Sequence, residues 1–216
     1  MAAPVLLSAH NCWFPPPHQA DADGLLAMGG TLSTERLLAA YRLGIFPWYA
    51  DELPLWWHPN PRFVLFPNKL RVSKSMRRIM QQQLFEITEN QDFSAVIAAC
   101  KNTPRKGQEG TWINQDMINA YTTLHASGMA HSYEAWENGQ LVGGLYGVKL
   151  GKVFFGESMF SHKSNASKAA FIGAVQMMLQ QGIQLIDCQV YTEHLESLGA
   201  EMVDRETFML WLERYL

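Results

Sequence analysis

Two stretches decide the fold of this chain: Val153-Phe154-Phe155-Gly156-Glu157-Ser158-Met159-Phe160 and Ile183-Gln184-Leu185-Ile186-Asp187-Cys188-Gln189-Val190. Each is mostly apolar or aromatic and is bounded by glycine or polar residues, which predicts a β-strand. Between them, apolar residues recur at helical spacing from Asn165 to Gln181, and Gly182 follows as a helix-ending glycine. This order of strand, helix and strand predicts a βαβ unit with parallel strands and a right-handed crossover.

Polar side chains stand at the ends of both strands. Side chains of a strand alternate between its faces; we expect one face to carry Val153, Phe155, Glu157 and Met159, and one face of the second strand to carry Ile183, Leu185, Asp187 and Gln189. Open α/β sheets bind ligands at the carboxyl ends of their strands, so Glu157, Asp187 and Gln189 are predicted to form the floor of a site. The alternative is that Asp187 caps a turn and Glu157 pairs with a lysine, and these residues alone leave it open.

Composition indicates a globular chain with a real core. The 216 residues are 48% apolar and 17% charged, which leaves room for one large domain or two small ones. The three cysteines are too scattered for a zinc pattern or a disulfide framework. No basic segment precedes the apolar residues 4–7, and no run of about 18 uncharged apolar residues occurs. We therefore expect a cytoplasmic protein.

Charge is unevenly distributed along the chain. The net charge of -3 argues against a generally basic nucleic-acid binder, but residues 69–106 carry eight basic residues against three acidic ones. A local basic face suits contact with phosphates. The residues expected to make such phosphate contacts are Lys69, Arg71, Lys74, Arg77 and Arg78. The alternative is a solvated helix face.

The N-terminal part combines one helix with aromatic segments. Residues 33–43 are predicted as a helix capped by Ser33, and residues 23–30 as a loop with an apolar insert. Residues 44–49 and 55–62 hold three of the seven tryptophans, and their prolines argue against an ordinary helix or a central strand. Such rings either stack on nucleotide bases or form an aromatic core, and we expect most of them in the core.

From residue 62 onward the predicted order is strand, helix, strand, helices, antiparallel strands, helix, strand and helix, with Asn138-Gly139 as a hairpin turn. The predicted fold class is α/β (α+β): a small N-terminal α/β domain at residues 1–61, then a mixed-sheet catalytic domain at residues 62–216 with helices on both faces. This second domain is similar to the acetyltransferase fold called GNAT. That fold grips the pyrophosphate of its cofactor with a glycine-rich turn, whereas residues 161–168 contain no glycine, which argues against acetyl-CoA chemistry.

Longer runs of sequence carry a resemblance to one family. They are Gly24-Leu25-Leu26-Ala27-Met28-Gly29-Gly30, Gly44-Ile45-Phe46-Pro47-Trp48, Trp56-Trp57-His58-Pro59-Asn60-Pro61-Arg62, Gly110-Thr111-Trp112-Ile113, Gly143-Gly144-Leu145-Tyr146-Gly147-Val148, Gly156-Glu157-Ser158-Met159-Phe160-Ser161, Asn165-Ala166-Ser167-Lys168 and Leu185-Ile186-Asp187-Cys188-Gln189. In these runs, which span nearly the whole chain in order, the sequence closely resembles the bacterial leucyl/phenylalanyl-tRNA–protein transferases.

The resemblance implies an aminoacyltransferase. It would take Leu, Phe or, less readily, Met from aminoacyl-tRNA and join it to the α-amine of a protein with N-terminal Arg or Lys, which marks that protein for N-end-rule degradation. Chemically this is aminolysis of an ester: the amine loses a proton, an oxyanion is stabilised and the ribose hydroxyl leaves. The resemblance implies no cofactor and no metal.

The resemblance also implies roles for the residues of the predicted site. Asp187 would polarise Gln189, whose carbonyl oxygen would help to withdraw the proton of the attacking amine. An equally sound account has Gln189 position the amine while the proton passes through the ribose hydroxyl. Glu157 would hold the cationic amine or the basic side chain of the acceptor.

The resemblance makes tRNA the partner of the five basic residues between 69 and 78, which would contact its phosphates. Five further residues would bind its aminoacyl-adenosine end. Trp48 and Trp112 match aromatic positions implicated in holding the terminal adenosine. Phe155, Met159 and Ile186 would form walls for the Leu or Phe side chain, because Met and aromatic walls accept unbranched side chains of varied shape.

Two other functions remain alternatives at this point. One is an N-acetyltransferase on the same fold, and the other is a tRNA-binding module without catalysis. Transfer of labelled leucine from Leu-tRNA to an Arg-starting peptide separates all three.

Overall fold

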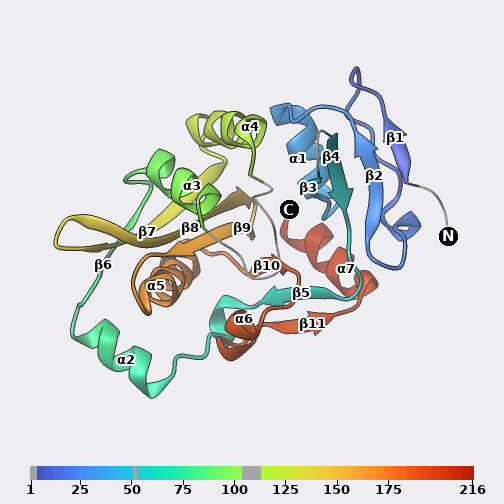
Figure 1. Ribbon diagram of the computed structural model, residues 1–216. Coiled ribbons are helices and arrows are strands. Elements are labelled where there is room, and N and C mark those ends of the chain that lie inside the picture. The colour runs from blue at the N-terminus through green and yellow to red at the C-terminus, as the bar shows by residue number, and fades with distance from the viewer. Residues whose placement is uncertain (1–3, 51–52, 104–112) are drawn as a thin grey trace.

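The structure, a computed structural model, describes residues 4–50, 53–103 and 113–216. Its strands form two sheets, a four-stranded sheet of order β1-β2-β4-β3 and a seven-stranded sheet of order β11-β5-β10-β9-β8-β7-β6 (Figure 1). None of the helices in the described ranges is long and apolar enough to cross a membrane.

The smaller sheet comes from the N-terminal part of the chain. Its strands are β1 (Val5–Leu7), β2 (Leu25–Gly29), β3 (Phe46–Ala50) and β4 (Leu53–Trp57). β1 and β2 are parallel, while β4 pairs antiparallel with β2 on one side and with β3 on the other. A short 3-10 helix, η1 (Pro17–Gln19), precedes β2, and α1 (Thr34–Arg42) connects β2 to β3. The predicted helix is confirmed, with Ser33 accepting a hydrogen bond from the backbone of Arg36.

Two predictions for this part are wrong. Residues 23–30, expected as a loop, contain β2, and the segment 55–62, expected outside any central strand, contributes the interior strand β4. The prolines of that segment, Pro59 and Pro61, lie beyond the end of β4, and Pro54 lies at its other end, outside the part that pairs with β2. Pro47 lies in β3, an edge strand, where a missing N–H is tolerated.

The larger sheet begins where the second part of the chain begins. Its strands are β5 (Arg62–Leu65), β6 (Glu86–Glu89), β7 (Ala130–Glu137), β8 (Gln140–Leu150), β9 (Val153–Ser161), β10 (Leu185–Gln189) and β11 (Glu201–Val203). β9 and β10 are parallel, and the remaining neighbours are antiparallel, so the sheet is mixed as predicted.

Helices cover both faces of this sheet, which confirms the predicted fold class. The helices of this part of the chain are α2 (Lys74–Gln81), α3 (Phe93–Lys101), α4 (Gln115–Ala126), α5 (Ala166–Gln180), α6 (Glu193–Ser197) and α7 (Arg205–Tyr215), with the 3-10 helix η2 (Pro67–Lys69) after β5. α5 packs on one face, and α3 and α4 pack on the other (Figure 1).

The predicted βαβ unit positions the site. β9 and β10 pair in parallel from Val153 opposite Leu185 to Phe155 opposite Asp187, and α5 connects them. Pairing stops there, because β9 continues to Ser161 beside β8 while β10 ends at Gln189. The two strands therefore part just beyond Phe155 and Asp187.

Two clusters of buried apolar residues lie on the two faces of the larger sheet. The first, on the α5 side, includes Phe154 and Ile186. The second includes Phe155 and continues through Trp56 of the smaller sheet to Phe208 of α7. Because this second cluster spans both parts of the chain, the division between residues 1–61 and 62–216 stays a prediction.

Candidate active site

A cavity of about 370 Å³ lies where β9 and β10 part. Glu157 of β9 lines it together with Asp187 and Gln189 of β10. From the smaller sheet, Phe46 and Trp48 of β3 reach the same cavity. The structure therefore brings together the three polar residues that the sequence predicts at the ends of two strands.

Glu157 occupies a bulge in β9. On β8, Tyr146 faces Ser158 and Gly147 faces Gly156, so Glu157 is the extra residue between two paired positions. A bulge of this kind commonly re-aims a side chain beside an active site.

The bulge also changes which side chains share a face. Met159 packs against the core on the α5 side, whereas Phe155 belongs to the core on the opposite side. The prediction that strict alternation places Phe155, Glu157 and Met159 on one face is therefore wrong. Gly147 allows the bulge to form, since a Cβ there would lie 2.2 Å from the carbonyl oxygen of Phe155.

The carboxylate of Glu157 accepts three hydrogen bonds. Tyr41 Oη of α1 donates to Oε1 at 2.7 Å, Tyr121 Oη of α4 donates to Oε2 at 2.8 Å, and Gln189 Nε2 donates to Oε1 at 3.2 Å. Burial raises the pKa of Glu157 to about 7, although the three hydrogen bonds act in the opposite direction. Glu157 can therefore gain or lose a proton near neutral pH.

Asp187 is fully buried and forms an ion pair with Arg62 of β5. Arg62 Nε donates to Oδ1 at 2.8 Å and Nη2 donates to Oδ2 at 2.6 Å, while the guanidinium lies over the rings of Phe46 and Phe208. The alternative in which Glu157 pairs with a lysine is not what the structure shows: the described partners of Glu157 are Tyr41, Tyr121 and Gln189, and it is Asp187 that pairs with a basic residue.

Asp187 contacts Gln189 through the backbone. The N–H of Gln189 donates to Asp187 Oδ1 at 2.9 Å, while the side-chain amide of Gln189 turns to Glu157. Gln189 has a φ of +65°, and the register between β10 and β5 shifts between Asp187 and Gln189. The expectation that both side chains project from one regular strand face is therefore wrong; Asp187 fixes the strained backbone that presents Gln189.

Part of the cavity lining is apolar. Met159 and Ile186, predicted as walls, line the cavity together with Leu145 and Phe171, and all four belong to or pack against the core on the α5 side of the sheet. Phe155, also predicted as a wall, is fully buried against the ring of Tyr41, beneath Glu157, and does not line the cavity.

Trp48 lies between this cavity and a second one of about 400 Å³. The second cavity is lined by aromatic rings that include Trp48, Tyr49 and Trp57, with Asp23 at its edge. The ring of Trp48 makes an edge contact with that of Trp57. Trp112, the other residue predicted to hold adenosine, lies outside the described residues.

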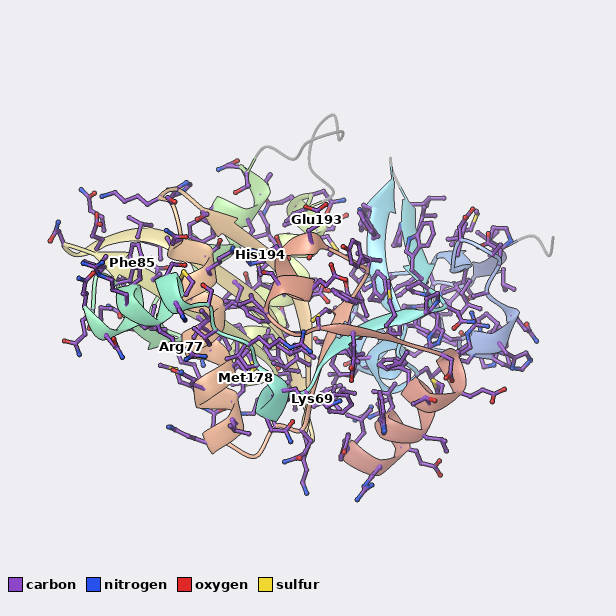
Figure 2. All side chains as sticks on the ribbon, turned by 90° about the horizontal axis from the view of Figure 1, so that it is seen from below. Lys69, Arg77, Phe85, Met178, Glu193 and His194 are labelled. Atoms are coloured by element: carbon purple, nitrogen blue, oxygen red, sulfur yellow. The ribbon has the colours of Figure 1, made fainter. Side chains whose placement is uncertain are left out.

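The predicted tRNA-binding residues lie on or next to η2 and α2, both of which contact α5. Lys69 is the last residue of η2 and Arg71 follows it, and Lys74, Arg77 and Arg78 are exposed on α2, which packs on α5. Figure 2 looks onto the face that carries Lys69 and Arg77. Lys69 Nζ forms an ion pair with Glu201 Oε1 at 2.8 Å, so part of the charge of Lys69 is already neutralised.

Sequence reasoning missed three residues of the site: Tyr41, Tyr121 and Arg62. The two tyrosines stand on helix faces whose apolar spacing indicates core, and both are indeed fully buried. The signal that could have found the two tyrosines is a hydroxyl on an apolar helix face, because a buried hydroxyl needs a hydrogen-bond partner.

The geometry indicates the kind of chemistry that the site can support. A carboxyl group whose pKa is raised to about 7, a carboxamide hydrogen-bonded to it and apolar lining residues beside them suit an enzyme that moves a proton next to an apolar substrate group.

Comparison with known proteins gives the family. The model of the family described as leucyl/phenylalanyl-tRNA protein transferase matches residues 64–213, and the model of that family's N-terminal domain matches residues 30–60. The chain belongs to this family, which confirms the resemblance read from the sequence, and it is an acyltransferase of the aminoacyl-tRNA–protein transferase type.

Individual relatives agree with the family assignment. The chain is 52% identical over 211 residues to the leucyl/phenylalanyl-tRNA–protein transferase of Myxococcus xanthus, covering 97% of this chain and 90% of that protein. It is 55% identical over 202 residues to the one of Christiangramia forsetii, covering 92% and 95%.

Two solved structures that match this chain each resemble it distantly. A GCN5-related N-acetyltransferase-like protein from Streptococcus suis matches with a TM-score of 0.39 and 12% identity, covering 67% of this chain and 60% of that one. L-PGS from Bacillus licheniformis matches with a TM-score of 0.41 and 13% identity, covering 91% and 67%. At these values the likeness carries no argument about function.

Proposed function

We propose that this protein transfers Leu, Phe or Met from aminoacyl-tRNA to the α-amine of proteins with N-terminal Arg or Lys, and so marks them for N-end-rule degradation. Family membership supports transfer of an aminoacyl group from tRNA to protein. Within the structure, the observation that carries the proposal is the Glu157–Gln189 pair beside an apolar recess.

The Glu157–Gln189 pair supports attack by an amine. Because Gln189 Nε2 donates to Glu157, the carbonyl oxygen of the Gln189 amide is left to accept an N–H of the incoming α-amine. An amide oxygen is a weak base, so Gln189 orients the amine and Glu157, with a pKa of about 7, is the group of suitable basicity. Asp187 acts indirectly, since it fixes the backbone of Gln189 through a hydrogen bond of 2.9 Å.

The apolar end of the cavity supports recognition of Leu, Phe or Met. Leu145, Met159, Phe171 and Ile186 present aliphatic, thioether and aromatic surface with no charged group among them. Such a recess accepts apolar side chains of several shapes and excludes charged ones.

Recognition of the tRNA would come from two places. Trp48 offers a ring at the edge of the cavity for stacking against the terminal adenine, together with Trp112. The exposed bases of α2 would contact phosphates, which positions the tRNA without reading its sequence. Neither contact needs a cofactor.

The experiment that tests this proposal measures transfer of labelled leucine from Leu-tRNA to two peptides that differ only in starting with Arg or Ala. We expect label on the Arg-starting peptide alone. Labelling of both peptides would contradict the proposed acceptor specificity. Acetylation of the peptide by acetyl-CoA without leucine transfer would favour an acetyltransferase, and tRNA binding without any transfer would favour a binding module.

A further inference from the structure

Tyr41 and Tyr121 reach Glu157 from two different helices. Both tyrosines are fully buried, and α1 and α4, which carry them, pack against each other (Figure 1). Their hydroxyls hydrogen-bond separately to the two oxygens of Glu157, and they also contact one another. The three groups form a closed ring of oxygen–oxygen contacts, and of the three only Glu157 lines the cavity.

Counting hydrogens in this ring shows what it can hold. Three contacts need three hydrogens, and each tyrosine hydroxyl supplies one. With Glu157 ionised, two hydrogens serve three contacts, so one contact is left unbonded. With Glu157 protonated, every contact of the ring is a hydrogen bond, and each group donates once. The ring can therefore hold one additional proton, while in its ionised state both tyrosines still donate to the carboxylate.

We propose that Glu157 takes up the proton released by the attacking amine, and that Tyr41 and Tyr121 are positioning residues that fix its carboxylate and set its proton affinity. This inference rests on the proposed function. As the carbon–nitrogen bond forms, the amine nitrogen gives one proton to the Glu157 carboxylate. As the ester carbon–oxygen bond breaks, the ribose oxygen takes one proton from Glu157, which returns to the ionised state.

The surroundings of Glu157 agree with this role. Burial is the largest influence and raises its pKa, the bonds from Tyr41, Tyr121 and Gln189 lower it, and the charge of Asp187 raises it slightly. Burial, followed by the charge of Glu157, raises the pKa of both tyrosines well above the ordinary value, so they remain hydroxyl donors.

Few other titratable groups lie near this ring. Among the described residues, these are Tyr146 of β8 beside the tyrosines, Arg62 of β5 paired with Asp187, Cys188 of β10, and His194 of α6, which lines the same cavity. Burial raises the pKa of Cys188 and lowers that of His194, so both are neutral near pH 7.

The test is the pH dependence of kcat/KM for leucine transfer in Tyr121→Phe and Tyr41→Phe. Each change removes a hydrogen bond that favours the carboxylate, so the pKa of Glu157 rises. The acid limb of the profile should move to higher pH by about one unit, with most activity recovered at alkaline pH. The acceptor amine is the same in every assay, so its own titration cannot cause the difference.

The matched control is Tyr133→Phe, which removes another buried hydroxyl that donates to a carboxylate, that of Glu89, away from the cavity. Its acid limb should stay at the wild-type pH. The inference would be overturned if the acid limb of the kcat/KM profile stayed at the wild-type pH in both Tyr41→Phe and Tyr121→Phe. It would also be overturned if kcat/KM fell by the same factor at every pH.

If the tyrosine variants fail to fold, a direct titration of the Glu157 carboxyl group in the wild-type protein tests the inference. In wild-type protein with 13C-labelled glutamate, the one carboxyl resonance that disappears in Glu157→Gln should titrate near pH 7. Titration near the ordinary glutamate value would contradict the inference. Absence of leucine transfer by the wild-type protein would instead count against the proposed function, and the titration would still decide whether the ring holds a proton.

Discussion

Asp187 and Arg62 depend on each other because both charges are buried. The carboxylate and the guanidinium share two hydrogen bonds, and neither side chain is exposed to solvent by more than 1%. Removing one partner of such a pair leaves an uncompensated charge in the interior. Asp187 is therefore both a structural residue and a support for the site.

We predict that Asp187→Asn lowers the free energy of unfolding by roughly 3–5 kcal/mol. Urea unfolding measures this. Gln189→Ala is the control, because it keeps the ion pair and should change stability by less than about 1 kcal/mol. Wild-type stability in Asp187→Asn would show that the pair with Arg62 does not support the fold.

Glu157 predicts a pH dependence of stability with a definite sign. Its pKa is raised from 4.5 to about 7, so between these values the folded protein binds more protons than the unfolded chain. This contribution to stability is therefore complete at acid pH and is lost as the pH rises through about 7. Glu157→Gln should gain stability relative to wild type as the pH rises from about 5 to about 8. A difference between the two proteins that does not vary with pH in urea unfolding would contradict the raised pKa.

At the residue scale, the sequence predicted Glu157, Asp187 and Gln189 because two apolar strands turn polar at the same end. It could not predict their partners. Arg62 precedes Asp187 by 125 positions and Tyr41 precedes Glu157 by 116, and only the fold brings them together.

At the element scale, the bulge in β9 decides the geometry of the site. Alternation, the rule used to assign the strand faces, assumes a regular strand, and one extra residue at Glu157 breaks it. Glycines inside a strand, such as those of β8, can mark a bulge or a close backbone approach, but sequence alone does not say which strand carries the extra residue.

Paired glycines on β8 and β9 test the bulge. Gly147→Ala would place its Cβ 2.2 Å from the carbonyl oxygen of Phe155, so the backbone must shift, and we expect a loss of at least about 2 kcal/mol of stability together with slower transfer. At its partner Gly156, a Cβ would meet the carbonyl oxygen of Asp187 at 3.5 Å, an ordinary contact, so Gly156→Ala should cost less than about 1 kcal/mol. Equal stability losses in urea unfolding would contradict the close approach at Gly147.

The basic face of α2 makes a prediction about salt. If Lys74 and Arg77 contact tRNA phosphates, the double variant Lys74→Ala, Arg77→Ala should weaken tRNA binding and reduce the slope of log K against log salt concentration by about 1–2. The control removes two exposed charges elsewhere, Lys152 and Arg214. An unchanged slope in the α2 variant would mean that this face is only solvated.

At the scale of the whole molecule, the order of elements from residue 62 onward was predictable because periodicity, helix caps and the Asn138-Gly139 turn all agree. The N-terminal sheet was less predictable, because proline-rich and aromatic segments obscure its strands. Burial joins the two parts: Trp56 and Phe208 belong to one apolar cluster, and Arg62 lies between the rings of Phe46 and Phe208. The cavity is bounded by residues from both parts, so the site depends on the complete fold.

The central claim is that the Glu157–Gln189 pair carries out aminoacyl transfer, and its most direct test is a single-turnover measurement. Labelled Leu-tRNA is mixed with an Arg-starting peptide and excess enzyme, and the rate of transfer is compared between wild type and Gln189→Ala. Loss of one hydrogen bond made in the transition state predicts a rate reduced on the order of 10²–10³-fold, with unchanged affinity for Leu-tRNA. A folded Gln189→Ala protein that transfers leucine at the wild-type rate would contradict the account.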